Sequence, residues 1–375
     1  MLIQPFIRNK KFSMDKKRIA IIGVKGLPPF GGAANVVDNL IEQLSGKYDF
    51  TIYATASATN HKGLYKGANQ IVLAKFPIKA LNIFYYYIAA AFHAVFKGKY
   101  DGVHLHQMDG AFILLLLRLK YPVIATSHGI TYTNGKWKNW SYPYFKVNEW
   151  FQAHLSNHLT VVSRSLTDHY ARMIPAGKIS YIPNGITPAT LPSERPEAKD
   201  YILFAAGRIL PIKGLHFLLS ALKQNQFKGK LIVLGDLTQH KKYTEAVLAL
   251  SSGLDVEFRG LIKEKNLLNA YIAHARFFVF PSVIEAMSMM LLEVASLRTP
   301  VICSDIVQNT DIFDTDEMLF FHTESDKDLA DKLNQALEHP QRMAAMAEKA
   351  FTSLKSKYLW SAIALQYENV YDRYL

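Results

Sequence analysis

Residues 275–304 restrict the fold of this chain more than any other stretch of its sequence. They begin with a short apolar run, residues 276–280, whose aromatic and β-branched content is typical of a buried strand. Residues 288–297 then have the apolar content of a largely buried helix, which Thr299 and Pro300 end before a second strand starts at residues 301–303. A strand, a helix and another strand in this order predict an α/β fold with a parallel sheet.

Two glutamates of this unit are candidates for ligand binding. Glu285 falls in the loop between the first strand and the helix, and Glu293 falls in the second turn of that helix. The free N–H groups and the macrodipole at a helix start attract a diphosphate, and five residues of helix rise about 7.5 Å, comparable with the reach from a diphosphate to its ribose. The pattern favours a nucleotide-sugar site in which Glu293 binds the ribose and Glu285 the sugar. The alternative is that Glu285 caps the helix and Glu293 is solvated.

The letters of this segment, PSVIEAMSMMLLEVASLRTPVICSD, resemble the Glu-x7-Glu signature of the retaining nucleotide-sugar glycosyltransferases of family 4. The resemblance implies the GT-B fold, in which two Rossmann-like α/β domains face each other across a cleft. It also implies that Met287, Ser288 and Met289 bind the donor. The family commonly has Gly-Phe-Gly after the first glutamate, where this chain has Ala286-Met287-Ser288. Glycine allows a closer backbone approach than these residues do.

The first predicted strand, residues 18–22, is followed by a glycine-rich loop and a helix over residues 34–44. This order opens a Rossmann-like unit, although the glycines lack the Gly-x-Gly-x-x-Gly spacing of a dinucleotide site. The letters IGVKGLPPFGGAANVV resemble the first loop of family 4 enzymes. The resemblance implies that Gly31 and Gly32 face the donor phosphates, and Lys25 is an acceptor-side candidate. An ordinary tight turn is the alternative.

His128 follows a predicted strand at residues 122–127, and open α/β sheets place their ligands at such strand ends. The resemblance implies that this histidine lies beside the transferred sugar, and a structural role is the alternative. Asp109, which follows another predicted strand at residues 102–106, is a weaker acceptor-side candidate. A helix is expected between these two strands, around residues 111–119.

Residues 187–200, with three prolines, are the predicted linker between two domains. A second Rossmann-like pattern follows, in which Arg208 and Lys213 place two cations on the loop after a strand at residues 201–206, as suits a departing diphosphate. Gly235 and Gly260 follow two further predicted strands whose ends should line the nucleotide. We expect an acceptor-side domain over residues 1–186, a donor domain over residues 201–356, and a last helix over residues 357–375 that returns to the first domain.

Charge is divided unevenly along the chain. Residues 1–190 hold 22 Lys and Arg against 8 Asp and Glu (+14), whereas residues 191–375 hold 21 against 23 (−2), which gives the net charge of +12. An anionic partner for the first half follows. Since no nucleic-acid-binding module is evident, we expect a saccharide or lipid-linked saccharide acceptor and an anionic membrane surface, not nucleic acid. The apolar segment 80–96 is either a core helix or a helix partly exposed to headgroups through its tyrosines and flanking lysines.

The remaining features favour a cytoplasmic enzyme, peripheral on the membrane, without a cofactor. The single cysteine, Cys303, excludes an intramolecular disulfide, and the first residues lack the apolar core of a secretory signal. Asp314 and Asp316 match a metal-binding Asp-x-Asp pattern, but we interpret them as a solvated turn, so no metal is expected. The expected function is metal-independent transfer of a sugar from a nucleotide diphosphate to a hydroxyl, in cell-surface polysaccharide, lipopolysaccharide or capsule assembly. The alternatives are a nucleotide-sugar epimerase of the same fold and a non-enzymatic basic binding protein.

Overall fold

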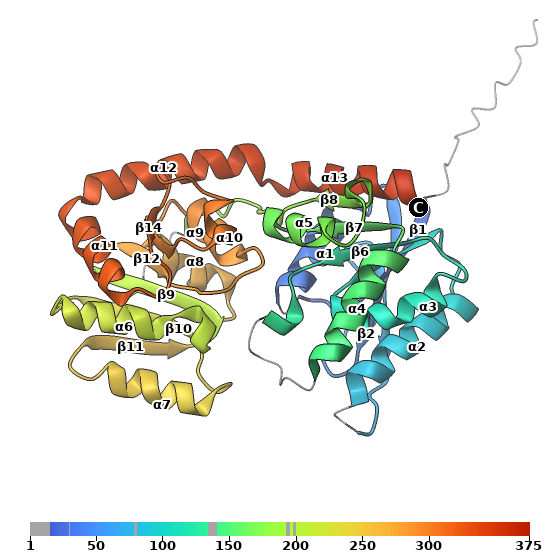
Figure 1. The fold of residues 1–375 in the computed structure, drawn as a ribbon, viewed down its shortest axis with the longest axis horizontal. Coiled ribbons are helices and arrows are strands. Elements are labelled where there is room, and N and C mark those ends of the chain that lie inside the picture. Colours follow the sequence, from blue (N-terminus) through green and yellow to red (C-terminus); the bar gives the residue numbers. More distant parts are fainter. Residues whose placement is uncertain (1–15, 30, 79–80, 134–140, 193–195, 198–199) are drawn as a thin grey trace, which may run out of the picture.

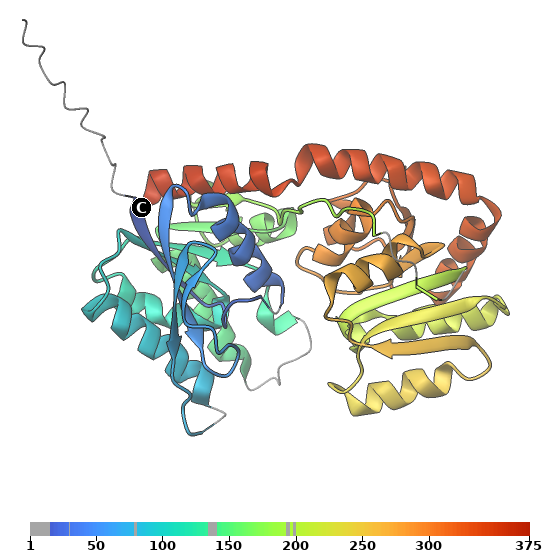
Figure 2. The same cartoon turned by 180° about the vertical axis from the view of Figure 1, so that it is seen from behind.

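The computed structural model describes residues 16–29, 31–78, 81–133, 141–192, 196–197 and 200–375. These residues form two sheets, each covered by helices on both faces, and a pair of C-terminal helices that runs along both halves of the molecule (Figures 1 and 2). The strands of the first sheet lie within residues 17–181, and those of the second lie within residues 201–321.

The first sheet has eight strands in the order β3-β4-β2-β1-β5-β6-β7-β8. All neighbouring strands are parallel except β3 and β4, which are antiparallel. The strand order reverses beside β1, so the carboxyl ends of β1 and β5 form the switch point at which ligands bind in open α/β sheets. The strands are β1 (Lys17–Ile22), β2 (Tyr48–Thr55), β3 (Gly63–Tyr65), β4 (Ala68–Leu73), β5 (Gly102–His106), β6 (Val123–Ser127), β7 (His158–Val161) and β8 (Ile179–Tyr181).

The helices of this half are amphipathic or buried elements that cover the sheet. The predicted helix at residues 111–119 is instead a 3-10 turn, η2 (Met108–Ile113), that continues into the short α3 (Leu114–Leu117). Gly110 lies within η2 against the ring of Tyr87, where an added Cβ would come within 2.1 Å of that ring. The other helices are α1 (Gly32–Leu44), α2 (Asn82–Phe96), α4 (Tyr142–Leu155) and α5 (Arg164–Ala171).

The second sheet is entirely parallel, in the order β11-β10-β9-β12-β13-β14. Its switch point lies between β9 and β12, next to the Glu285 loop. Arg208 is the last residue of β9 and not part of the following loop, because β9 extends two residues beyond the predicted strand. The strands are β9 (Tyr201–Arg208), β10 (Lys230–Asp236), β11 (Asp255–Gly260), β12 (Phe277–Phe280), β13 (Val301–Ser304) and β14 (Leu319–Phe321). The helices are α6 (Leu215–Gln224), α7 (Lys241–Leu250), α8 (Lys265–Ala273), α9 (Met289–Ser296), α10 (Val307–Thr310), α11 (Asp326–Glu338) and α12 (Pro340–Lys357).

The last helix, α13 (Trp360–Tyr374), packs on α1 of the first half. Tyr367 and Tyr371 are buried there, and the Tyr371 hydroxyl lies 2.7 Å from Nδ1 of His104 in β5. The chain enters α13 beside residue 186: the Ile186 N–H donates to the Tyr358 carbonyl at 2.7 Å, and the Trp360 N–H donates to the Ile186 carbonyl at 3.2 Å. The two segments that connect the halves therefore pair with each other. Among the described residues, no helix is long and apolar enough to cross a membrane.

Candidate functional site

Loops from the two halves of the chain meet at residues 129 and 286. Gly129, two residues after β6, has φ +127°, and a Cβ added to it would lie 2.9 Å from Cβ of Ala286. Nearby, the Asn184 backbone N–H donates to Sδ of Met287 at 3.0 Å. The structure therefore brings His128 next to the loop that carries Glu285, although 157 residues separate them in the sequence.

Lys213 and Glu285 form an ion pair at this junction. Lys213 Nζ lies 2.5 Å from Glu285 Oε1, and both side chains are largely shielded from water. The backbone fixes the pair: the Val283 N–H donates to the Ile212 carbonyl at 2.9 Å, and Gly214, with φ +72°, passes so close to the Pro281 carbonyl that a Cβ would lie 1.9 Å from its oxygen. Glycine is required at such a position, because an L side chain would both strain the backbone and collide.

The start of α9 is capped by Ser288 and not by Glu285. The Leu291 N–H donates to the Ser288 hydroxyl at 3.4 Å. The capping alternative for Glu285 is thus not what the structure shows, and its carboxylate faces Lys213 instead. Met289 begins the helix, and the first N–H groups of α9 point back toward the Glu285 loop, as expected for an anion site at a helix start.

Glu293 lies in the second turn of α9, as predicted from the sequence, and its side chain is 15% exposed. Its carboxylate pairs with Lys265 at the start of α8, with Nζ to Oε1 at 2.6 Å. Lys265 was not predicted as part of the site. The only local signal is a mixed-charge run, residues 263–265, which resembles an ordinary surface turn.

Three more predicted donor residues lie at the carboxyl ends of β9, β10 and β11. Arg208 is in register with Asp236, and an added Cβ on Gly235 would lie 2.2 Å from the Ala206 carbonyl oxygen. Gly260 ends β11 with φ +71° and has open space around it. Arg208 is exposed and makes no ion pair within the part of the chain that the structure describes. These strand ends share the sheet edge from which the Glu285 loop departs.

His128 is the outermost of three histidines in contact. Its Nε2 lies 2.9 Å from Nδ1 of His106, whose ring packs on that of His104 with centroids 4.0 Å apart. His104 is fully buried, and its Nε2 lies 2.6 Å from the Thr126 hydroxyl. Burial lowers the pKa of His128 to about 4 and that of His104 to about 3. His128 is therefore an uncharged hydrogen-bonding group at neutral pH. Neither His104 nor His106 was predicted as part of the site.

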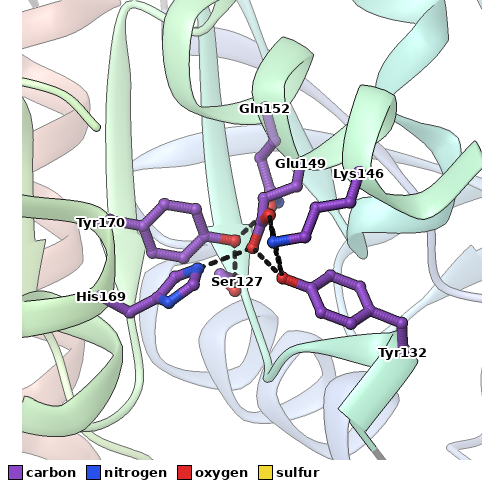
Figure 3. Close-up of polar contacts among 7 residues, drawn as sticks. All are labelled: Ser127, Tyr132, Lys146, Glu149, Gln152, His169 and Tyr170. Carbon is purple, nitrogen blue, oxygen red and sulfur yellow. Dashed lines mark hydrogen bonds and ion pairs between the residues drawn. The ribbon is translucent and has the colours of Figure 1, made fainter. Parts of the chain in front are cut away.

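A polar network on α4 and α5 supports the residues on either side of His128 (Figure 3). At its centre is Glu149, which is 1% exposed and accepts hydrogen bonds from the Tyr132 hydroxyl at 3.0 Å and from His169 Nε2 at 2.7 Å. Lys146 Nζ completes the cluster, 3.1 Å from Glu149 Oε2. Sequence reasoning missed this network. Its signal was Glu149 itself, which is the only acidic residue between Asp109 and Asp168.

A second set of contacts from α4 and α5 reaches Ser127, the residue directly before His128. The Tyr170 hydroxyl lies 3.2 Å from the Ser127 hydroxyl and 3.2 Å from Oε1 of Gln152 on α4. Ser127 and Tyr132 bracket His128 in the chain, and both are held by α4 and α5 (Figure 3). These contacts hold the His128 segment on the side of α4 and α5. The side of Gly129 that faces Ala286 contacts the other domain.

The remaining predicted residues of the first half are less directly connected to this junction. Asp109 accepts a hydrogen bond from the Tyr87 hydroxyl at 2.9 Å, so its carboxylate helps to hold α2. Lys25 has an exposed side chain, and its carbonyl accepts from the Thr55 N–H at 2.9 Å. Gly31 and Gly32 lie at the start of α1, where a Cβ on either would meet nothing within 4 Å.

Asp314 and Asp316 lie far along the chain from these loops. Asp316 pairs with Lys349 of α12 at 2.9 Å, and the Asp314 N–H donates to Glu317 Oε2 at 2.8 Å. Within the described ranges, no three His, Cys, Asp or Glu side chains are grouped so that they could hold a metal ion.

Comparison with known proteins places both halves in glycosyltransferase families. Residues 30–190 match Glycosyltransferase Family 4, and residues 189–353 match Glycosyl transferases group 1. The 2-deoxystreptamine N-acetyl-D-glucosaminyltransferase of Niallia circulans is 26% identical over 301 residues, which are 74% of this chain and 77% of that protein. The lipopolysaccharide 1,2-N-acetylglucosaminetransferase of Salmonella typhimurium is 29% identical over 232 residues, which are 56% of this chain and 60% of that protein.

Solved structures agree on the fold. The sucrose-phosphate synthase of Thermosynechococcus elongatus superposes with a TM-score of 0.81 at 20% identity, over 96% of this chain and 99% of that one. Anabaena HepE in complex with UDP and glucose superposes with a TM-score of 0.78 at 16% identity, over 95% of this chain and all of that one. The chain belongs to glycosyltransferase family 4, the group 1 glycosyltransferases, and is a nucleotide-sugar-dependent transferase with the GT-B fold.

Proposed function

We propose that this enzyme transfers a sugar from a nucleoside diphosphate to an acceptor hydroxyl with retention of the anomeric configuration and without a metal ion. The observation that carries the proposal is the Lys213–Glu285 pair, because Glu285 lies in the loop that touches the His128 segment of the other domain. The carboxylate and the ammonium thus belong to segments of the donor domain next to the residues that contact the His128 segment, which carries the neutral imidazole.

In this proposal the donor lies along α9. Lys213 Nζ has three N–H donors, of which one points to Glu285, so the other two are available to diphosphate oxygens. Together with the exposed Arg208 and the first N–H groups of α9, they stabilise the charge that develops on the leaving diphosphate, usually the largest catalytic term in such a site. Glu293 accepts hydrogen bonds from the ribose hydroxyls, with Lys265 beside it.

The sugar then lies between Glu285 and His128. Glu285 accepts hydrogen bonds from its hydroxyls, and the neutral His128 contributes a hydrogen bond on the reacting face. The leaving phosphate assists deprotonation of the acceptor hydroxyl in a front-face displacement, so no side chain is needed as a covalent nucleophile. The acceptor is a saccharide or lipid-linked saccharide in cell-surface polysaccharide, lipopolysaccharide or capsule assembly, and two curated relatives make N-acetylglucosamine the first donor sugar to test.

The test is a panel of UDP-N-acetylglucosamine, UDP-glucose and GDP-mannose in thermal shift, followed by sugar transfer with the stabilising donor in excess chelator. Binding to the native state raises its apparent stability by about 2.7 kcal/mol at a hundredfold excess over Kd. One donor should raise the melting temperature and give a glycosylated product. A panel with no shift contradicts the donor assignment, and release of an epimerised nucleotide sugar instead of a glycoside contradicts transfer.

A further inference from the structure

Helix α2 exposes a continuous apolar stripe. Phe84, Ile88, Phe92 and Phe96 follow one another at intervals of four residues, so they lie on one side of the helix, and they are 37%, 45%, 52% and 70% exposed. Two of the three tyrosines expected at the headgroups are not on this side: Tyr86 and Tyr87 are buried against the sheet, where the Tyr86 hydroxyl accepts from the Gly23 N–H at 3.0 Å. Tyr85 is partly exposed, and its ring lies 5.3 Å from that of Phe76 between centroids. The most exposed large side chains of the helix are therefore phenyl and aliphatic groups.

A neighbouring element extends the stripe into a face. The end of α3 is tied to the end of α2, because Lys120 Nζ donates to the Gly98 carbonyl at 3.1 Å and the Tyr121 hydroxyl donates to the Ala94 carbonyl at 2.9 Å. Leu115 and Leu119 are 58% and 78% exposed there. We call these side chains the α2–α3 face: Phe84, Ile88, Phe92, Phe96, Leu115 and Leu119.

The face is unusual within this molecule. Of the 18 large apolar side chains that are exposed among the described residues, 11 fall between Ile78 and Trp150, around α2, α3 and α4. Single exposed apolar residues are common on protein surfaces. A group of them close together is typical of a surface that binds another protein, a membrane or a ligand. Figures 1 and 2 place α2 and α3 on the side of the first domain that is turned away from the second domain, so the donor domain does not cover it.

Positive charge surrounds the face. Residues 75–121 contain six Lys and Arg and two Asp. Both acids are engaged elsewhere: Asp101 accepts from the Arg18 N–H at 2.7 Å, and Asp109 accepts from Tyr87. Lys97 and Lys99, directly after Phe96, are exposed and have no carboxylate within ion-pair distance in the described part of the chain. A second copy of this chain would bring the same positive charges against these, whereas anionic lipid headgroups would complement them.

We propose that the α2–α3 face docks on the interface of an anionic lipid bilayer, with Phe92 and Phe96 among the acyl-chain ends and Lys97 and Lys99 among the headgroups. Aromatic and aliphatic groups flanked by lysines are the composition of an interfacial helix. The buried side of α2 is bonded to the glycine-rich loop after β1 through Tyr86, so the helix that carries the face packs on the acceptor-side edge of the sheet. This surface would bring the enzyme to a lipid-linked acceptor. Only this role in acceptor binding rests on the proposed transferase function; the docking itself does not.

The test is co-sedimentation of the full chain with vesicles of phosphatidylcholine alone or with about one third phosphatidylglycerol. Wild type should partition at least tenfold more strongly onto the anionic vesicles, and added salt should reduce this preference because it screens the charges. Phe92→Gln with Phe96→Gln should reduce partition about tenfold or more, since two exposed rings no longer enter the interface. Lys97→Gln with Lys99→Gln should lower it about fivefold per lysine.

Matched controls lie on α7 of the second domain. Leu248 is 46% exposed, and Lys241 and Lys242 are adjacent exposed lysines, so Leu248→Gln and the double Gln replacement at 241 and 242 should leave partition unchanged. All variants should keep the donor-induced thermal shift.

No partition of wild type at low salt, equal partition onto both vesicles, or a loss in the α7 controls equal to that in the face variants would overturn the inference. A wild-type dimer that Phe92→Gln with Phe96→Gln converts to monomer would assign the face to a second copy and overturn it as well. A donor panel without any shift would refute the transferase proposal and not the docking surface.

Discussion

The two halves of the molecule contain almost equal numbers of basic residues but very different numbers of acidic ones. Residues 1–190 hold 22 Lys and Arg with 8 Asp and Glu, and residues 191–375 hold 21 with 23. In the second half, two of the three cations near the candidate site are paired with a carboxylate, Lys213 with Glu285 and Lys265 with Glu293, and the exposed Arg208 is the third. In the first half, the buried Glu149 supports the His128 segment, and the exposed Lys97 and Lys99 follow directly on an exposed apolar face.

This difference separates two kinds of recognition. Paired charges held by a fixed backbone suit one ligand of defined geometry, such as a nucleotide sugar. Unpaired lysines beside exposed rings suit an extended anionic surface, for which no single geometry is needed. We therefore expect the two halves to differ in energetics as they differ in composition.

The largest expected effect is on turnover in the second half. Lys213→Ala or Arg208→Ala should lower kcat about 10²–10³-fold, because each removes a preorganised positive group from the leaving diphosphate. Lys230 is the matched control, since it is also half-buried and ion-paired but lies at the amino end of β10, at the opposite edge of the sheet. Lys230→Ala should keep near-normal turnover. A folded Lys213→Ala, Arg208→Ala double variant with normal kcat would contradict the donor assignment.

Acid should weaken the first half more than the second. Burial lowers the pKa of His93, His104, His106, His128 and His158 in the first half, and of His216 in the second. The unfolded chain then binds protons at a higher pH than the folded chain, so the stability is complete above about pH 6.5 and decreases as pH falls toward 4. The slope approaches about 1.4 kcal/mol per pH unit for each such histidine.

Urea midpoints between pH 7.5 and 4.5 measure this loss. Amide exchange, corrected for its intrinsic pH dependence, assigns it to β5 and β6 or to β9 and β10. Equal loss of protection in both sheets, or a midpoint that does not change between pH 7 and 5, would show that the buried histidines do not distinguish the halves.

A third prediction concerns the buried carboxylate of the first half. Glu149→Ala should reduce the free energy of unfolding by about 1–3 kcal/mol, because Tyr132 and His169 lose a buried acceptor. Glu348, a 60% exposed partner of Arg298, is the control, and its replacement by Ala should change stability by less than about 0.5 kcal/mol. Denaturant midpoints compare the two variants, and equal midpoints would mean that the network of Figure 3 carries no stability.

The sequence predicted the second half of the site better than the first for a physical reason. Glu285 and Glu293 belong to one strand-loop-helix unit, so local periodicity is enough to position them. The roles of Glu149, His104 and Lys265 depend on partners that are distant in the sequence, so they could not be predicted from it. Tyr371, for example, contacts His104 although 267 residues separate them. Helix α2 is a similar case. Because α2 is apolar on most of its surface, its sequence predicts a helix but does not show which side is exposed. Packing against the sheet determines that side.

Replacement of the Asp-x-Asp pair is expected to have no effect on turnover. Asp314→Asn with Asp316→Asn should leave turnover unchanged, because Asp316 pairs with Lys349 on α12, away from the junction of the two domains. Turnover should also persist in excess chelator. Activity that disappears on chelation and returns with manganese or magnesium would contradict the metal-independent mechanism and would direct attention to carboxylates of the second half.

The anomeric configuration of the product tests the central claim most directly. The enzyme is incubated with the donor that stabilises it and with its acceptor, and the anomeric configuration of the new glycosidic bond, which does not mutarotate, is determined by proton NMR. With an α-linked donor, the account predicts an α-linked product, because the leaving phosphate and the acceptor share the face of the sugar between Glu285 and His128. A β-linked product from the same donor would contradict it.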